Sequence, residues 1–195
     1  MRSPGSLGLL AAVAIATTAL GCAAPARLYV NPQADVSFYK KVVVLPFTNL
    51  SPQSFAGERV TRAFITELIV ADRFKVVEPA DFWLELTRIG GEPDVQGLYD
   101  AAKLKQAAGT VEATGIIRGA VTEYQTVRAG NEDFPVVSFD AQMIDVATGN
   151  VVWRISVTQR GKSRLPFIGG GERTFGAVTQ EACIEAIRTL QGKGL

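Results

Sequence analysis

Histidine is absent from the 195-residue sequence, and this absence removes several classes of active site. A catalytic triad built on histidine, a histidine general base and most zinc or haem ligand sets all need that side chain. The sequence also lacks the G-x-x-x-x-G-K-[ST] pattern of a phosphate-binding loop. We therefore expect no catalytic residues, no metal site, no cofactor and no small-molecule substrate, and we expect that the protein is not an enzyme.

Cysteine and net charge are also scarce. The two cysteines are Cys22 and Cys183, and Cys183 falls on the apolar face of a predicted C-terminal helix, where we expect an inert core residue. The 20 Lys and Arg residues nearly balance the 19 Asp and Glu residues. A surface that binds nucleic acid needs a clear excess of Lys and Arg. We therefore expect no nucleic-acid partner.

The N-terminus has the layout of a secretory signal, in which Arg2 precedes an apolar stretch over residues 7–20. This stretch is shorter than the roughly 20 apolar residues that a membrane-spanning helix needs. The sequence ALGC at 19–22 resembles a bacterial lipobox, and this resemblance implies that Cys22 is lipidated after cleavage in front of it. The alternative is an ordinary secretory signal cut near residues 19–24, which would leave Cys22 unmodified.

Lipidation at Cys22 would fix where the protein works. Two or three acyl chains give a stable anchor, whereas one chain binds a membrane only marginally. In enterobacterial lipoproteins an Asp directly after the cysteine retains the protein in the inner membrane, so Ala23 favours the outer membrane. We predict a lipoprotein signal peptide at 1–21, a lipidated tether at 22–40 and a single periplasmic domain at 41–195.

Residues 41–195 alternate between strand and helix patterns. A β-branched run over 41–47 predicts a buried strand, and apolar spacings of three and four over 54–71 predict an amphipathic helix. Ser51 or Ser54 is expected to cap this helix. A second strand is expected at 73–77, parallel to the first because a helix connects them. The other predicted elements are helices at 80–89, 94–108 and 172–191 and strands at 114–128, 135–146 and 151–160.

The three long strands indicate the fold class. Apolar and polar residues alternate in them, as at Val151, Trp153, Ile155 and Val157, which predicts antiparallel strands with one buried face. We expect Trp153 to fill the core or the sheet surface. Asp145, Thr148 and Gly149 are expected to form a turn between the last two strands. The order β-α-β-α-α-β-β-β-α predicts an α/β protein, a two-layer or three-layer sandwich with a mixed sheet.

Four segments resemble one superfamily of bacterial lipoproteins. They are KVVVLPFTNLS at 41–51, RFKVVEP at 73–79, GTVEATGIIRGAVTEY at 109–124 and AQMIDVATGNVVWRISVTQRG at 141–161. These segments are similar to the curli-secretion (CsgG-like) channel lipoproteins, the TolB amino-terminal domain and the outer-membrane lipoproteins that activate penicillin-binding proteins. The resemblance implies a TolB-like periplasmic domain, tethered to the outer membrane, that works through protein contacts without catalysis.

Three functional hypotheses follow. The first is an assembly or interaction factor for envelope biogenesis, secretion or cell-wall synthesis. The second is a subunit of an oligomeric curli-type export channel, although a membrane-spanning strand needs about 9–11 residues with an apolar face, and the predicted core leaves few residues for such strands. The third is an enzyme, such as a hydrolase acting on peptidoglycan, which the missing histidine, nucleophile motif and metal-ligand set make the weakest.

Two segments are candidate contacts for a protein partner, which would be a periplasmic or outer-membrane protein or a second copy of the chain. The segment from 160 to 173 surrounds the apolar sequence LPFI with basic residues, so it could dock a partner or touch anionic lipid. Its candidate residues are Arg160, Lys162, Arg164, Phe167 and Arg173. The turn at 48–57 is the second candidate, through Asn49 and Phe55. The alternative for the first segment is a solvated loop whose Phe167 packs on the sheet.

Overall fold

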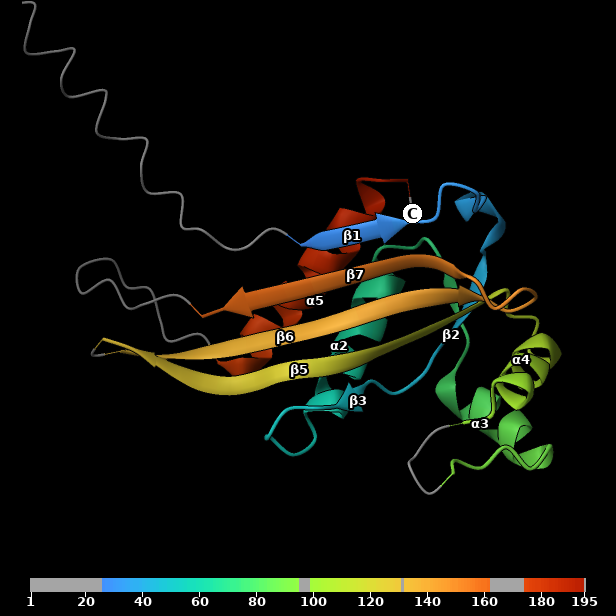
Figure 1. The fold of residues 1–195 in the computed structure, drawn as a ribbon, viewed down its shortest axis with the longest axis horizontal. Helices are drawn as coiled ribbons and strands as arrows, with labels where there is room; N and C mark the ends of the chain where they lie inside the picture. Colours follow the sequence, from blue (N-terminus) through green and yellow to red (C-terminus); the bar gives the residue numbers. More distant parts are fainter. Residues whose placement is uncertain (1–25, 95–98, 131, 162–173, 195) are drawn as a thin grey trace, which may run out of the picture.

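The computed structural model describes residues 26–94, 99–130, 132–161 and 174–194, which build a mixed β-sheet and its covering helices (Figure 1). The strands are β1 (Arg27–Val30), β2 (Lys41–Val44), β3 (Thr48–Asn49), β4 (Lys75–Val76), β5 (Gly115–Ala129), β6 (Glu132–Asp145) and β7 (Val151–Arg160). The helices are the short η1 (Val36–Phe38), α2 (Ala56–Val70), α3 (Pro79–Arg88), α4 (Ala101–Thr110) and α5 (Phe175–Gln191).

The strand order is β1-β7-β6-β5-β2-β4, with β3 paired to β5 beyond the end of β2. β2 runs parallel to both β4 and β5, whereas β5, β6, β7 and β1 form an antiparallel ribbon. The helix α2 makes the crossover between β2 and β4, so the predicted parallel pair is confirmed. The sheet is mixed, as the element order predicts.

One face of the sheet is covered by α2 and α5. The side chains between them form the larger core, which includes Phe64 of α2, Ala182 of α5, and Phe139 and Trp153 of the sheet. Trp153 is fully buried, so of the two places expected for it, the core and the sheet surface, it occupies the core. Cys183 is also fully buried, and burial, with a smaller contribution from the charge of Glu67, raises the pKa of its thiol far above the ordinary value. Its predicted role as an inert core residue agrees with this position.

Among the described elements, helices cover the opposite face only at one end. There α3 and α4 pack on β2 through a second cluster that includes Val43, Phe82, Leu86 and Leu104. The sheet therefore has three layers at the β2 end and two layers along β5, β6 and β7, where no described element covers the outer face (Figure 1). Among the helices of the described ranges, none has both the length and the apolar character needed to cross a membrane.

Several boundaries differ from the sequence predictions. β2 ends at Val44, before Pro46, although Leu45 still donates its N–H to the Ile117 carbonyl at 2.8 Å. The helix α2 begins at Ala56 after Phe55, so neither Ser51 nor Ser54 is its cap. The strands β1 and β3 were not expected, and β1 lies inside the range predicted as a tether.

Candidate functional site

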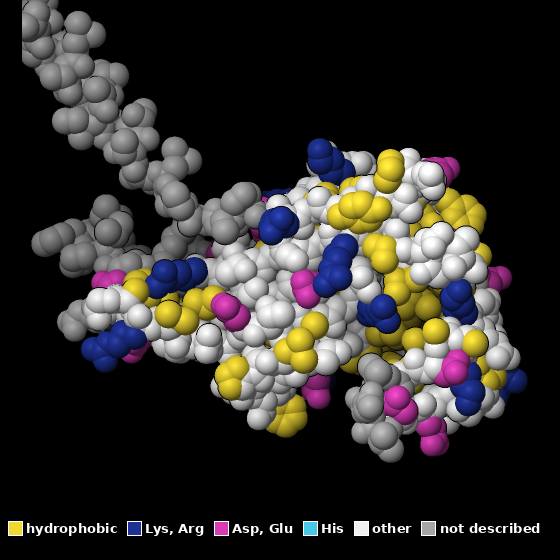
Figure 2. All heavy atoms as spheres, viewed as in Figure 1, with side chains coloured by type: hydrophobic (Ala, Val, Ile, Leu, Met, Phe, Trp, Pro, Cys, Tyr) yellow, Lys and Arg dark blue, Asp and Glu magenta, His cyan; other side chains and the backbone are white. Residues whose placement is uncertain are grey.

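The open face of the sheet carries a polar surface. In β5, β6 and β7 every second residue points away from the helices, because side chains alternate along a strand. The outward positions include Arg118, Asp140, Gln142 and Arg154, which the antiparallel register brings side by side. Figure 2 shows this face as largely polar, with separate positive and negative side chains along the sheet.

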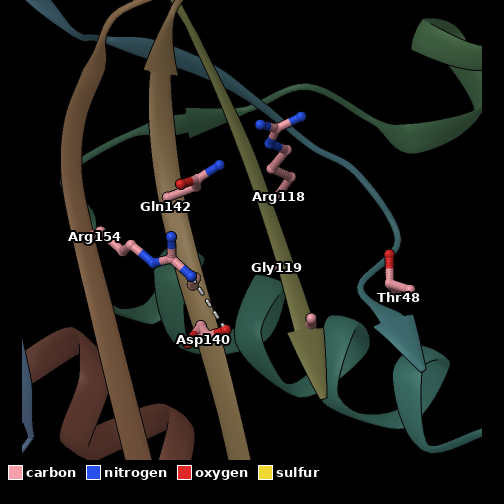
Figure 3. A pocket seen from close by; sticks show the side chains of 8 residues that line it. Thr48, Arg118, Gly119, Asp140, Gln142 and Arg154 are labelled. Atoms are coloured by element: carbon pink, nitrogen blue, oxygen red, sulfur yellow. Dashed lines mark hydrogen bonds and ion pairs between the residues drawn. The ribbon is translucent and has the colours of Figure 1, made fainter. Parts of the chain in front are cut away.

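A shallow cavity of about 230 Å³ lies between these side chains (Figure 3). We call it the arginine pocket; its lining includes Thr48, Arg118, Asp140, Gln142 and Arg154. On one side of the pocket, Asp140 contacts both Arg154 and Ser156. Its Oδ2 lies 3.4 Å from Arg154 Nη2 in an ion pair, and its Oδ1 accepts a 2.9 Å hydrogen bond from Ser156 Oγ. On the other side, the Gln142 oxygen accepts from Arg118 Nε and Nη2 at 2.8 and 3.1 Å when its amide is oriented for this contact.

The charges of the arginine pocket do not cancel. Asp140 is the carboxylate that faces Arg154, whereas Arg118 contacts the neutral Gln142. The pocket thus presents two guanidinium groups and one carboxylate. Guanidinium groups bind carboxylates through paired, charge-assisted hydrogen bonds. This arrangement can receive acidic side chains of another protein. In the described ranges, no three His, Cys, Asp or Glu side chains are grouped so that they could hold a metal ion.

A rigid turn borders the arginine pocket. Residues 49–55, which we call the braced turn, follow Thr48 of the pocket wall, and Leu50 donates its N–H to the Val121 carbonyl of β5 at 2.9 Å. The Asn49 side chain fixes the turn from inside. Its oxygen accepts from the N–H and hydroxyl of Ser51 at 3.0 and 2.8 Å, and its amide donates to the Gln53 carbonyl at 2.8 Å.

The braced turn exposes two large apolar side chains, Leu50 with 64% and Phe55 with 65% of its surface exposed. Figure 2 shows apolar side chains over this turn, at the lower edge of the sheet. Phe55 also has a φ of 63°, in the left-handed region where residues other than glycine are strained. An exposed aromatic side chain in a strained backbone adds little to the core, so the ring of Phe55 is available for a contact outside the domain.

The residues predicted as partner contacts divide into three groups. Asn49 and Phe55 lie in the braced turn beside the arginine pocket. Arg160 ends β7, at the far end of the open face, where its guanidinium stacks 4.4 Å from the centre of the Phe134 ring. Lys162, Arg164, Phe167 and Arg173 lie outside the described residues, as does Cys22, the predicted lipidation site.

The sequence does not reveal the arginine pocket. Its alternation pattern marks Gln142 and Arg154 as outward-facing, but an outward position in a strand is usually only solvated surface. The missing information was the register, which places Arg118 opposite Gln142 and Gln142 opposite Arg154. A search for charged residues that share one face of a predicted antiparallel ribbon could have found the set.

A second polar cluster stabilises the turn between β6 and β7. Asp145 accepts hydrogen bonds from the N–H and hydroxyl of Thr148 at 2.6 and 2.7 Å, and from the Tyr39 hydroxyl at 2.9 Å. Gly149 adopts a φ of 80° there, so the predicted turn is confirmed. Burial alone would raise the pKa of Asp145, but the hydrogen bonds from Thr148 and Tyr39, with the charge of Lys105, lower it overall. This cluster is structural.

We expect the Asp145 cluster to make the stability of the fold depend on pH in the acid range. The folded pKa of Asp145 lies below its ordinary value of 3.8, so its stabilisation is complete above that value and is lost as the pH falls through the folded pKa. Replacing Tyr39 by Phe removes one charge-assisted hydrogen bond and should cost roughly 1.5–3 kcal/mol near pH 7. Urea unfolding at a series of pH values measures both effects, and Y39F should lose less further stability in acid than the wild type.

The hydrogen bond between Tyr39 and Asp145 also predicts a loss of stability at alkaline pH. Burial, followed by the hydrogen bond to Asp145, raises the pKa of Tyr39 to about 12. The neutral phenol is therefore favoured in the fold, and its stabilisation is lost as the pH rises from 10 towards 12. Y39F has no phenol to ionise, so it should lack this alkaline loss of stability. Equal alkaline loss in both proteins would contradict the assignment.

Comparison with known proteins places the chain in a family. The family model described as peptidoglycan-synthase activator LpoB matches residues 20–157, which is more than half of the chain. This match supports the activator group among the three groups that the sequence resembles; it does not support the curli-channel group. No curated protein matches the chain.

Solved structures with TM-scores of 0.50 and above share the fold. The PelC dodecamer from Paraburkholderia phytofirmans is 21% identical, with a TM-score of 0.58 over 85% of this chain and 96% of that chain. The lipoprotein GNA1162 from Neisseria meningitidis is 17% identical, with a TM-score of 0.50 over 79% of this chain and 99% of that chain. The LpoB C-terminal domain from Salmonella enterica is 18% identical, with a TM-score of 0.49 over 65% and 87% of the two chains. On the family match, this chain belongs to the peptidoglycan-synthase activator LpoB family.

Proposed function

We propose that this protein is an outer-membrane lipoprotein whose periplasmic domain activates a peptidoglycan synthase by direct contact. The family match over residues 20–157 carries the proposal. In it, Cys22 bears the lipid and the domain has no catalytic activity of its own. The protein then acts by binding a synthase, and binding can raise the activity of that enzyme when it favours an active conformation.

The arginine pocket and the braced turn together form the proposed contact surface. They are adjacent, because Thr48 belongs to the pocket wall and the braced turn follows it directly. The pocket offers positive charge for acidic side chains, and the turn offers the exposed Leu50 and Phe55 for an apolar recess. A buried apolar anchor beside charged contacts is the usual composition of a specific interface.

Charge reversal in the arginine pocket tests this function. In R118E/R154E two positive charges become negative, so an acidic synthase surface would be repelled. We expect the affinity for the purified synthase of the same bacterium to fall roughly 100-fold, at about tenfold per arginine. Stimulation of glycan-strand synthesis should fall in parallel. Wild-type affinity should also decrease as the salt concentration rises, because exposed charges are screened.

The matched control is R62E/R188E, which makes the same change in charge on α2 and α5. Both arginines are exposed, and their helices cover the opposite face of the sheet. This variant should stimulate the synthase as the wild type does. Equal loss in the two double variants would mean that net charge alone acts and would refute the proposed surface. Failure of the wild-type protein to bind or stimulate the synthase would refute the function itself.

A further inference from the structure

The sheet ends in two unpaired edges, one at β1 and one at β4. Within the described ranges β1 pairs with β7 on one side and β4 pairs with β2 on one side, and no described strand covers either outer side. An uncovered edge presents unpaired N–H and C=O groups, which form a template for another strand. Each edge is therefore able to accept a strand.

Backbone hydrogen bonds show which residues face outward. In β4, Lys75 donates to the Lys40 carbonyl at 2.7 Å and Val77 donates to the Val42 carbonyl at 2.9 Å. Successive residues of a strand direct their backbone N–H and C=O groups to opposite sides. The N–H and C=O groups of Val76 and Phe74 therefore point away from β2. In β1, Asn31 donates to the Val152 carbonyl of the β7 segment at 2.8 Å, so Val30 and Leu28 direct theirs away from β7.

The side chains at the two edges are also alike. Leu28 and Val30 of β1, and Phe74 and Val76 of the β4 edge, are half-buried and pack at the margin of the core under α2 and α5. The same residues thus have outward backbone groups and apolar side chains on the helix side. Pairing the two edges would join two partly covered apolar margins into one continuous layer.

Charge also favours a pairing between β4 and β1. A groove of about 700 Å³ lies along β4, and its lining includes the acidic residues Asp72, Glu78 and Asp81. Lys41 and Lys75 also line the groove, so three carboxylates face two lysines there, and Lys41 Nζ lies 3.6 Å from Glu112 Oε2. The groove is therefore acidic overall. The strand β1 brings one charged side chain, the exposed Arg27, which is positive.

We infer that β1 of one copy adds to β4 of a second copy, so that their two sheets become continuous. The strand directions permit this. β1 is antiparallel to β7, β7 to β6 and β6 to β5, whereas β5, β2 and β4 are parallel, so β1 and β4 run in opposite directions. The new pair is antiparallel. The contact joins two different surfaces, so it repeats from copy to copy and builds a ring or a filament.

Disulfide trapping tests this contact in the full-length chain. In L28C/V76C and V30C/V76C the new thiols lie on the helix side of the joined strands, where neighbouring Cα atoms are about 5.5 Å apart and can be bridged. Under mild oxidation at rising protein concentration, at least one of the two variants should give a ladder of dimers, trimers and larger species that reducing agent abolishes. Each chain carries one cysteine on the β1 edge and one on the β4 edge, so the ladder should not stop at the dimer.

The control is Y29C/V76C. A shift of one residue places the Tyr29 side chain on the opposite face of the sheet, out of reach of position 76. The single variants L28C, V30C and V76C report any cross-link through Cys22 or Cys183. An equal ladder in Y29C/V76C, or no ladder in either test variant while circular dichroism shows native folding, would overturn the inference. This test involves no synthase, so its result is independent of the proposed function.

Discussion

Phe64→Ala should lower the free energy of unfolding by about 3–5 kcal/mol, which is the usual cost of removing a buried aromatic ring. Phe64 is fully buried in α2. Its ring lies 5.3 Å from the centre of the Phe47 ring and 6.0 Å, edge to face, from that of Phe139. These rings join α2 to the sheet, so the backbone cannot collapse easily into the space left by the alanine. Because single domains are stable by about 5–15 kcal/mol, this change alone could leave the fold marginal.

Urea unfolding of the wild type and F64A measures this loss. The midpoint should fall while the slope stays constant, because the same surface becomes exposed on unfolding. The matched control is V70A on the same helix, where the valine is 73% exposed, and it should change stability by less than about 0.5 kcal/mol. A loss below about 1 kcal/mol in F64A would show that the aromatic cluster does not hold α2 on the sheet.

Phe55→Gly should have opposite effects on stability and on function. Glycine adopts a positive φ without strain, so the variant should gain about 1 kcal/mol of stability. The same change removes the exposed ring from the proposed contact surface. A buried aromatic anchor in an interface is typically worth about 2 kcal/mol or more, so we expect roughly 30-fold weaker binding to the synthase. Thermal unfolding and a binding titration on the same sample measure both effects.

Two controls separate the ring from the backbone. F55A keeps the strained φ and removes the ring, so it should lose binding without gaining stability. E112G relaxes another residue with a positive φ, at 56°, and should gain stability without a change in binding. If F55G gains stability and binds as well as the wild type, then the braced turn is not a contact. That result would restrict the proposed surface to the arginine pocket.

The elements that the sequence predicts correctly are those with a local repeating pattern. The spacing of Val60, Phe64 and Leu68 marks the buried face of α2, and these three residues are among its buried side chains. The alternation in β7 likewise matches its buried positions from Trp153 to Val157, whereas at the start of the strand Val152 is buried and Val151 is only half-buried. Such patterns reflect one-sided burial, which depends on residues close together in the chain.

The elements that the sequence does not reveal depend on distant residues. The strand β1 has four residues, and it is a strand because Leu28 lies opposite Ile155 and Val30 opposite Trp153. Its own sequence, RLYV, between Pro25 and Pro32, is too short to show a period. The Ser51 side chain bonds to Asn49 instead of capping α2, because the turn closes on β5 before the helix begins.

The arginine pocket shows the same limit for function. The sequence indicates that Arg154 faces away from the core, but it does not say whether a helix covers that face. The answer depends on where α3 and α4 pack, and they pack on β2 at the end of the sheet. Local pattern therefore predicts the polar face, whereas its exposure and its pairing of Arg118 with Gln142 come from the tertiary arrangement.

If Cys22 bears the proposed lipid, the position of β1 sets how far the domain can extend from the bilayer. If residues 22–40 were all a free tether, the chain could span about 60 Å between Cys22 and the domain. Because β1 begins at Arg27, the stretch that precedes the sheet can span only about 17 Å. With the lipid at Cys22, the domain is then confined to a shell next to the outer membrane. A synthase partner anchored elsewhere would have to bring its own contact region across the periplasm, since this domain cannot reach out to meet it.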